Sequence, residues 1–332
     1  VTVWFDHQFL GDGEAYARRS KEFAGHRRGE LRESVIATLK TLSENSYRAA
    51  EERMRQLADA NQIQLVSWHW IVNGFSCYVS KDGLDDLQTV PGVKKIFLAR
   101  SSIGTRRSDQ RRPSVFPVSK EHGSDEQTFD PSRYKHPWYI RYLQADKTWK
   151  RLDVSGAGTL NIVIDGNFLF SPNVTGNLYR NAEETPENGI DDDGNGLIDD
   201  YHGFNFARGD AVLAARPVGS GRDPGSTHGY QCAAIICGTG SENSPYEFGI
   251  APSASWAGVV VGQNFESAMQ WAIEQGADTV SMSFSMPNLG QVRSHWRKMT
   301  EHAAFCGVCC ASGAGNFARE GSSSYAPIPV QL

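Results

Sequence analysis

The first hundred residues combine short apolar runs with one long amphipathic stretch. Apolar side chains recur every three or four positions through residues 31–60, with Glu, Arg and Lys between them, which predicts helix. A polar cluster at residues 43–46 predicts a break that divides this helix into two pieces. Strands are predicted near residues 1–5, 64–70, 75–79 and 94–98, and a short helix near 82–88. This order predicts a small α+β sandwich of the split βαβ type.

The hydrophobic pattern then stops. Residues 104–135 are polar and carry the basic run from Thr105 to Pro113, without any periodicity. Such composition predicts an exposed linker between two units. Two roles stay open for it, a simple tether or a processing site, because proteases accept flexible exposed backbone.

Residues 136–332 alternate between buried strands and helices. Strands are predicted near 160–164, 257–262, 279–284 and 307–311, and helices near 228–237, 266–275 and 291–305. Apolar strands separated by helices predict an α/β fold with a doubly wound parallel sheet. In such sheets functional residues gather at the carboxyl ends of the strands. We therefore divide the chain into residues 1–103, 104–135 and 136–332.

Composition narrows the function classes. The chain has 332 residues, 39% of them hydrophobic and 21% charged, and a net charge of −5. This charge favours neither nucleic acid nor an anionic membrane as a partner. No apolar run reaches the roughly 18 residues of a membrane span. The chain opens on Val1 instead of Met, so we expect that an upstream segment has been removed, and Asn173-Val174-Thr175 is a glycosylation sequon if the protein is secreted. The location stays unknown, with a secreted or organellar one favoured over the cytosol.

Six cysteines are present, three of them between Cys306 and Cys310 in an apolar run. No second pair of ligands stands at zinc-finger spacing. We interpret this run as small buried hydrophobic residues on a strand, in preference to a metal or disulfide role.

Three polar residues follow predicted strands or begin a helix. Asp165 directly follows a buried strand, where it could orient a histidine, bind a metal or ribose, or cap a turn. His228 begins a helix, where the positive helix end favours a neutral imidazole that can act as a base. Asn316 ends a run of small residues that lets backbone approach a ligand. Each could equally be structural when taken alone.

Together these residues and their neighbours resemble a known family. The motifs are Asp165 after its strand, His228-Gly229, Gly249 to Ala254, Ser281-Met282-Ser283 and Ala314-Gly315-Asn316. Their order and spacing are similar to those of the subtilases. Asn73-Gly74-Phe75 and Pro91-Gly92-Val93 likewise make residues 1–103 resemble the inhibitory prodomain of that family.

The resemblance implies a serine endopeptidase that acts on peptide or protein substrates. In it Asp165 would orient His228, His228 would act as general base and acid, and Asn316 would donate to the oxyanion. The walls of the substrate site would be Ser283, Phe284, Ser285, Gly313, Ala314 and Gly315.

The nucleophile is the missing part. The family motif Gly-Thr-Ser-x-Ala-x-Pro lies well beyond the asparagine, whereas this chain ends sixteen residues after Asn316. We reject Ser323 as its counterpart because it comes too early. We therefore expect an incomplete catalytic domain, inactive alone, which a companion chain could complete. The alternative is a catalytically inactive pseudoprotease that serves as a scaffold or binding subunit.

An acidic segment between Asp165 and His228 predicts a metal site. Asp191, Asp193 and Asn195 stand at alternate positions, Gly196 supplies a turn, and Asp199 follows. This pattern is typical of the first part of an EF-hand calcium loop, although the terminal glutamate is absent. We predict structural calcium here, against the alternative of a solvated acidic loop. An unrelated α/β calcium-binding domain stays open as a third hypothesis.

Overall fold

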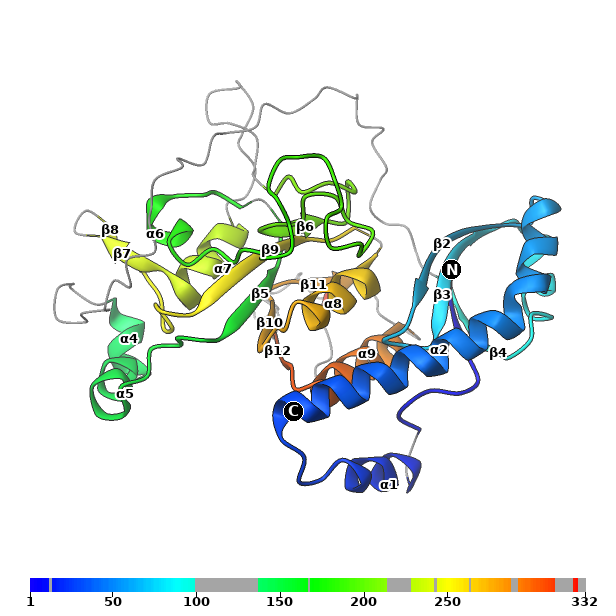
Figure 1. The fold of residues 1–332 in the computed structure, drawn as a ribbon, viewed down its shortest axis with the longest axis horizontal. Coiled ribbons are helices and arrows are strands. Elements are labelled where there is room, and N and C mark those ends of the chain that lie inside the picture. The colour runs from blue at the N-terminus through cyan, green and yellow to red at the C-terminus, as the bar shows by residue number, and fades with distance from the viewer. Residues whose placement is uncertain are drawn as a thin grey trace.

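Two β-sheets, one in each half of the chain, organise the fold (Figure 1), which we describe from a computed structural model. The structure describes residues 1–11, 14–98, 137–166, 168–213, 228–241, 244–262, 264–287, 292–313 and 325–327. The predicted linker at 104–135 lies outside the described residues.

The N-terminal sheet has four antiparallel strands in the order β2-β3-β1-β4. They are β1 (Thr2–Phe5), β2 (Ile63–His69), β3 (Gly74–Val79) and β4 (Val93–Phe97). Three helices accompany them, α1 (Glu14–Glu22), α2 (Arg28–Asp59) and α3 (Gly83–Leu87). This strand order is the one that the split βαβ pattern predicts. The helix α1 was not predicted.

The predicted break in the long helix is wrong, because α2 runs unbroken for 32 residues. Two of the polar side chains in question are accommodated within the helix instead of interrupting it. Ser43 Oγ donates to Lys40 O, and Ser46 Oγ donates to Leu42 O. Such bonds to the preceding turn leave the backbone helical. Ser43 is also buried, so α2 stays packed against the rest of the molecule at the position of the predicted break.

The second sheet has five parallel strands in the order β12-β10-β5-β9-β6. They are β5 (Leu160–Ile164), β6 (Gly203–Asn205), β9 (Ser255–Val260), β10 (Thr279–Met282) and β12 (Cys309–Ser312). The predicted α/β fold with a parallel sheet is confirmed. The short edge strand β6 was not predicted.

Helices cover both faces of this sheet. They are α7 (His228–Cys237), α8 (Phe265–Glu274) and α9 (Val292–Phe305). Successive side chains of β5 point to opposite faces, as in any strand. Ile162 and Ile164 belong to the cluster that contains α8 and α9, whereas Val163 packs with α7. The sheet is therefore doubly wound, as predicted.

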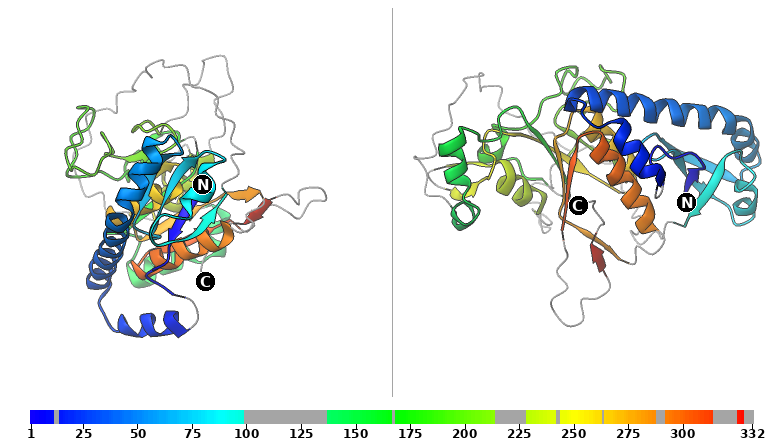
Figure 2. Two further views of the ribbon diagram at one scale, coloured as in Figure 1. Left: turned by 90° about the vertical axis from the view of Figure 1, so that its right-hand side faces the viewer. Right: turned by 90° about the horizontal axis from the view of Figure 1, so that it is seen from below.

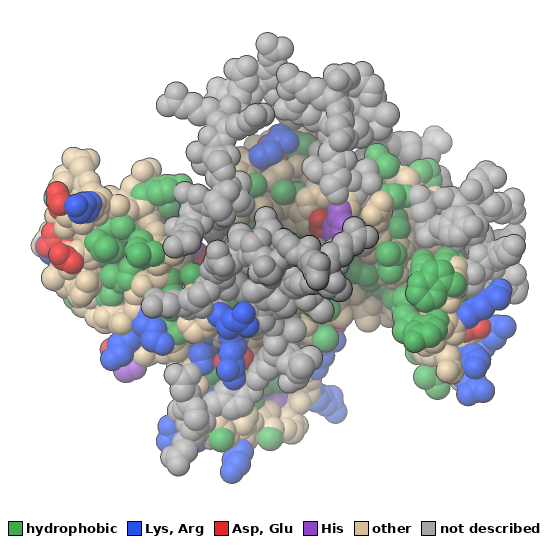
Figure 3. All heavy atoms as spheres, turned by 180° about the vertical axis from the view of Figure 1, so that it is seen from behind, with side chains coloured by type: hydrophobic (Ala, Val, Ile, Leu, Met, Phe, Trp, Pro, Cys, Tyr) green, Lys and Arg blue, Asp and Glu red, His purple; other side chains and the backbone are tan. Residues whose placement is uncertain are grey.

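Several shorter elements have no counterpart in the sequence prediction. They are α4 (Trp138–Tyr142), α5 (Ala145–Leu152), α6 (Pro172–Thr175), β7 (Thr239–Ser241), β8 (Ser244–Phe248), β11 (Ser285–Pro287) and β13 (Tyr325–Pro327). The β11–β13 pair projects away from the main sheet (Figure 2). Exposed apolar side chains gather on α4 and α5, Trp138 and Tyr142 among them (Figure 3).

The N-terminal unit packs against α8 and α9 (Figures 1 and 2). Its residues Leu10, Leu39 and Ile71 belong to the same apolar cluster as these two helices. Polar contacts reinforce this interface, since Gln270 Oε1 of α8 accepts hydrogen bonds from the backbone N–H groups of Trp70 and Ile71. The two halves thus share one continuous core in addition to their separate ones.

The interpretation of the cysteine run as buried residues is wrong for Cys309. Cys306 is buried, but Cys309 is exposed and Cys310 half-buried. The reason is that β12 forms an edge of the sheet and pairs, among the described residues, only with β10. All six cysteines are free. In the part of the chain that the structure describes, no helix has the length and apolar character of a membrane span.

Candidate active site

Asp165 lies where the central strand β5 ends, at the carboxyl edge of the parallel sheet. Its backbone N–H still donates to Val259 O of the neighbouring strand, at 2.9 Å, which fixes the position of the residue. The carboxylate is 9% exposed, and its Oδ1 accepts the N–H of Gly166 at 2.7 Å. The strand end and the following turn together hold the second oxygen, Oδ2, in one direction.

His228, the first residue of α7, meets that oxygen. Its Nδ1 lies 2.8 Å from Asp165 Oδ2, and its ring is 48% exposed. The close approach of α7 to the turn after β5 depends on Gly229, whose N–H donates to Gly166 O at 3.1 Å. A Cβ at Gly229 would stand 2.8 Å from the same carbonyl, so a larger residue would push the helix away. The predicted pairing of Asp165 and His228 is therefore present in the structure.

A third side chain, which sequence reasoning missed, completes this cluster. Cys232 lies one helical turn after His228, with Sγ 3.6 Å from Asp165 Oδ2 and 3.8 Å from His228 Nδ1. Burial and the charge of Asp165 raise the pKa of the Cys232 thiol, while a hydrogen bond from Ser283 acts in the opposite direction. The spacing of His228 and Cys232 by four residues in a predicted helix was the available signal.

Two of the predicted substrate-site segments also converge at this edge. Ser283 and Phe284 directly follow β10, and Ser283 is exposed and bonded to Cys232. Gly313 directly follows β12, and its N–H donates to Met282 O at 3.0 Å. The ends of β5, β10 and β12 therefore bring Asp165, Ser283 and Gly313 to one edge of the sheet, as expected for parallel strands.

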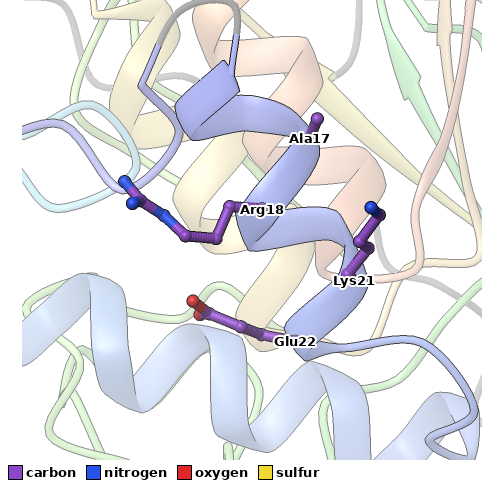
Figure 4. A pocket seen from close by; sticks show the side chains of 4 residues that line it. All are labelled: Ala17, Arg18, Lys21 and Glu22. Carbon is purple, nitrogen blue, oxygen red and sulfur yellow. The ribbon is translucent and has the colours of Figure 1, made fainter.

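The remaining predicted site residues lie largely outside the described part. Asn316, Ala314 and Gly315 are not among the described residues. Ser285 is described only as backbone, in β11. A surface hollow lined by four residues of α1 contains none of the predicted site residues (Figure 4). Its lining is Ala17, Arg18, Lys21 and Glu22.

The acidic segment forms a second cluster, with a different membership from the predicted one. Oxygens of Glu184, Asp193 and Asp200 lie within 4.8 Å of one another. Of the predicted calcium ligands Asp191, Asp193, Asn195 and Asp199, only Asp193 belongs to this group. Asp191 instead accepts the N–H groups of Asn195 and Gly196, Asp199 accepts those of Asn188 and Gly189, and the Asn195 amide donates to Asp193 and Asp200.

Two members of the acidic cluster are deeply buried. Asp200 is fully buried and Glu184 is 5% exposed. Burial and neighbouring carboxylates, Asp193 among them, raise the pKa values of both. Glu184 Oε1 accepts the N–H groups of Asp192 and Asp193, but Oε2 is buried without a hydrogen-bond partner among the described residues. A cation would satisfy this oxygen and relieve the repulsion between the carboxylates.

Comparisons with known proteins found similarity to subtilases. A model of the subtilase family matches residues 214–329, which include His228 and Ser283 but not Asp165. A curated relative, subtilisin-like protease 1 of Plasmodium berghei (strain Anka), is 29% identical over 143 residues. That match spans 41% of this chain but only 22% of the relative.

Solved structures of proteases are similar over about half of the chain. The MycP1 structure with its N-terminal propeptide removed has 19% identity and a TM-score of 0.31, covering 52% of this chain and 46% of that one. A lanthipeptide protease has 18% identity and a TM-score of 0.32, covering 51% and 42%. The family model, the curated relative and the motifs thus support a subtilase assignment, with the family-model match itself confined to residues 214–329.

Proposed function

We propose that the protein is a serine endopeptidase of the subtilisin type, in which Asp165 and His228 supply two of the three catalytic side chains. The observation that carries the proposal is the 2.8 Å contact between Asp165 Oδ2 and His228 Nδ1 at the carboxyl edge of the parallel sheet. A buried carboxylate on one ring nitrogen holds the imidazole in the tautomer whose other nitrogen can accept a proton.

In this mechanism His228 Nε2 removes the proton of the attacking serine hydroxyl and later gives it to the leaving amine. Asp165 stabilises the imidazolium that forms between these steps and does not itself take up the proton. Asn316 would donate to the oxyanion, and replacing it with alanine should lower kcat by about 10²–10³. The serine would come from the segment that carries the family motif.

The edge strand β12 indicates where the segment that carries the serine could pair with the sheet. Among the described residues β12 has a partner on one side only, and its Cys309 side chain is exposed. An edge strand presents unpaired N–H and C=O groups on its outer side, which can pair with a further strand. We propose that further chain, from this polypeptide or a companion, pairs with β12 and brings the serine to His228.

A peptidase assay tests this function. We expect no hydrolysis of fluorogenic peptides by the 332-residue chain alone, and hydrolysis when the segment with Gly-Thr-Ser-x-Ala-x-Pro is fused to it. In the fused protein Asp165→Asn should lower kcat by about 10⁴, because the histidine tautomer is lost. Turnover by the chain alone that Ser323→Ala abolishes would show that the wrong serine was rejected. A fused, folded protein without turnover would favour the pseudoprotease.

We further propose that residues 1–103 act as the inhibitory prodomain. The supporting observations are their own apolar core, which includes Val3, Phe5, Leu57 and Phe75, and their contacts with α8 and α9. Added separately to an active subtilase, residues 1–103 should inhibit it at micromolar concentration. Absence of inhibition by a folded fragment would contradict the assignment.

We also propose structural calcium, held by Glu184, Asp193 and Asp200. The supporting observation is the unsatisfied Glu184 Oε2 in a cluster of carboxylate oxygens, the donors that calcium prefers. Calcium at 100 times its Kd should stabilise the chain by about 2.7 kcal/mol. Glu184→Gln should reduce this gain in a thermal melt more than Asp191→Asn. The reverse order would favour the loop ligands predicted from sequence, and no gain at all would remove the metal.

A further inference from the structure

The peptidase mechanism uses the carboxylate and the imidazole of the active-site cluster but gives no role to its thiol. Cys232 is half-buried and stands four residues after His228 on the same face of α7. Its Sγ contacts both partners of the catalytic pair, at 3.6 Å from Asp165 Oδ2 and 3.8 Å from His228 Nδ1. These three atoms form a small triangle of an oxygen, a nitrogen and a sulfur.

The size of this triangle fits a metal ion. A tetrahedral zinc ion, with bonds of about 2.0–2.3 Å, holds its donor atoms about 3.3–3.6 Å apart. The two distances to sulfur are already close to that range, and the 2.8 Å contact between Asp165 and His228 would have to open by about 0.5 Å. The half-exposed His228 ring leaves the cluster accessible from solvent.

We propose that Asp165, His228 and Cys232 form a binding site for a borderline-soft divalent cation such as Zn²⁺, with solvent as the fourth ligand. Cysteine, histidine and aspartate are the three side-chain types that zinc uses. The mixed donor set separates this site from the all-oxygen cluster of Glu184 and Asp200, which suits a hard cation. The chain would thus hold two metal sites, one that prefers a borderline-soft cation and one that prefers a hard cation.

The surroundings of Cys232 favour a metal ligand over a reactive nucleophile. A free thiolate, the nucleophilic form of cysteine, would stand as a second anion 3.6 Å from the Asp165 carboxylate. A divalent cation removes this difficulty, because it takes the place of the thiol proton and balances the charge of both anions. Binding would release that proton to solvent, and the proton on His228 Nδ1 would move to Nε2.

This tautomer change gives the site a regulatory consequence, which rests on the proposed peptidase function. With a metal on Nδ1, the Nε2 atom of neutral His228 carries the proton and cannot accept one from a serine. The carboxylate that should stabilise the imidazolium is engaged by the same ion. Zinc would therefore switch off the general base without occupying the substrate site.

Cobalt spectroscopy on the 332-residue chain tests the site without any need for turnover. Co²⁺ replaces zinc in such sites, and a thiolate ligand gives a near-ultraviolet charge-transfer band together with strong tetrahedral visible bands. We expect these bands to saturate at one Co²⁺ per chain and to disappear when Zn²⁺ is added. Excess Ca²⁺ should leave them unchanged.

Three variants assign the ligands. Cys232→Ser should abolish the charge-transfer band, and His228→Ala should weaken Co²⁺ binding by more than the ~10–100-fold that loss of an outer-shell partner typically causes. Cys309→Ser is the matched control, since it removes an exposed thiol outside the cluster and should preserve the spectrum. His228→Ala also covers the case in which Cys232→Ser fails to fold, because its ring is half-exposed.

Two results would overturn the proposal: no thiolate band in the folded parent chain, or a band that persists in Cys232→Ser. The regulatory consequence has a separate readout in the fused peptidase. There Zn²⁺ should inhibit turnover, a chelator should restore it, and Cys232→Ser should resist the metal. Cobalt binding without inhibition would leave the site in place and reject only its effect on the base.

Discussion

Among the described residues, two histidine–carboxylate pairs have contacts shorter than 3 Å, and they differ in what surrounds them. His228 Nδ1 lies 2.8 Å from Asp165, and His295 Nε2 lies 2.6 Å from Glu266. The His228 side chain is 48% exposed, whereas that of His295 is 4% exposed. The same chemical pair thus occurs once at an accessible strand end and once deep inside the molecule.

The buried pair joins the two halves of the chain. His295 belongs to α9 and Glu266 to α8, and the second ring nitrogen of His295 accepts the indole N–H of Trp4 from β1 at 2.7 Å. Both ring nitrogens are therefore used by the protein itself, and no substrate can reach them. The comparison teaches that access, and not the pair alone, separates a candidate catalytic histidine from a structural one.

Removing one carboxylate from each pair should give the largest difference between them. Glu266→Ala removes a hydrogen bond to a charged group and leaves the Nε2–H of His295 buried without its acceptor, which should lower the free energy of unfolding by about 3 kcal/mol. Asp165→Ala breaks a pair whose histidine is half-exposed, which should lower it by about 1 kcal/mol or less. Urea denaturation of the 332-residue variants measures both. Equal losses would contradict the distinction, and Glu266→Gln, which retains a hydrogen-bond acceptor, should lose less than Glu266→Ala.

Removing the indole donor of Trp4, which contacts the buried His295–Glu266 pair, should lower stability by a smaller amount. Trp4→Phe keeps an aromatic ring beside Phe97, whose centroid lies 5.1 Å from that of Trp4, but removes the donor to His295. A buried acceptor left without its donor should lower stability by about 1–3 kcal/mol. Trp138→Phe is the control, because Trp138 is 75% exposed, and it should change stability by less than about 0.5 kcal/mol. A similar small change in both variants would argue against a structural role for the indole bond.

This contrast also shows what the sequence could and could not reveal. Strand β5 was predictable because all of its residues are buried and most of them are apolar. Asp165 could be predicted as a site residue because it follows a buried strand at the carboxyl edge of the sheet, and His228 because its motif begins a helix. The partners of the buried pair were not, since Trp4 and His295 are 291 residues apart and only the packing of the two halves brings them together.

The acidic site illustrates the same limit at shorter range. The alternation through residues 191–195 correctly pointed to a concentration of carboxylates, and Asp193 belongs to the observed cluster. Glu184 and Asp200 lie at either end of the loop and have no local pattern that links them. Their burial, together with the path of the loop between them, determines which oxygens converge, and neither can be read from residue spacing.

The free energy of unfolding should depend on pH, because two buried histidines, His69 and His302, have lowered pKa values in the folded chain. Burial lowers the pKa of His69 to about 4 and that of His302 to about 3. The unfolded chain therefore binds more protons than the folded one below pH 6.5, so stability must fall as the pH falls. Burial opposes the charge of Glu266, but His69 and His295 outweigh it and lower the pKa to about 2, so this carboxylate adds to the loss only below about pH 4.5.

Between pH 6.5 and 5.5 each of these two histidines should reduce the free energy of unfolding by up to about 1.4 kcal/mol. His302 donates from Nδ1 to Ile71 O and accepts the N–H of Leu10, so it bridges α9 and the N-terminal unit beside Lys298 and Glu301. His302→Gln keeps a donor and an acceptor but cannot titrate, so urea denaturation across this interval should show a shallower slope. An unchanged slope would mean that protonation elsewhere controls the contact. A shallower slope would make the contact of α9 with the N-terminal unit an acid-sensitive part of the chain.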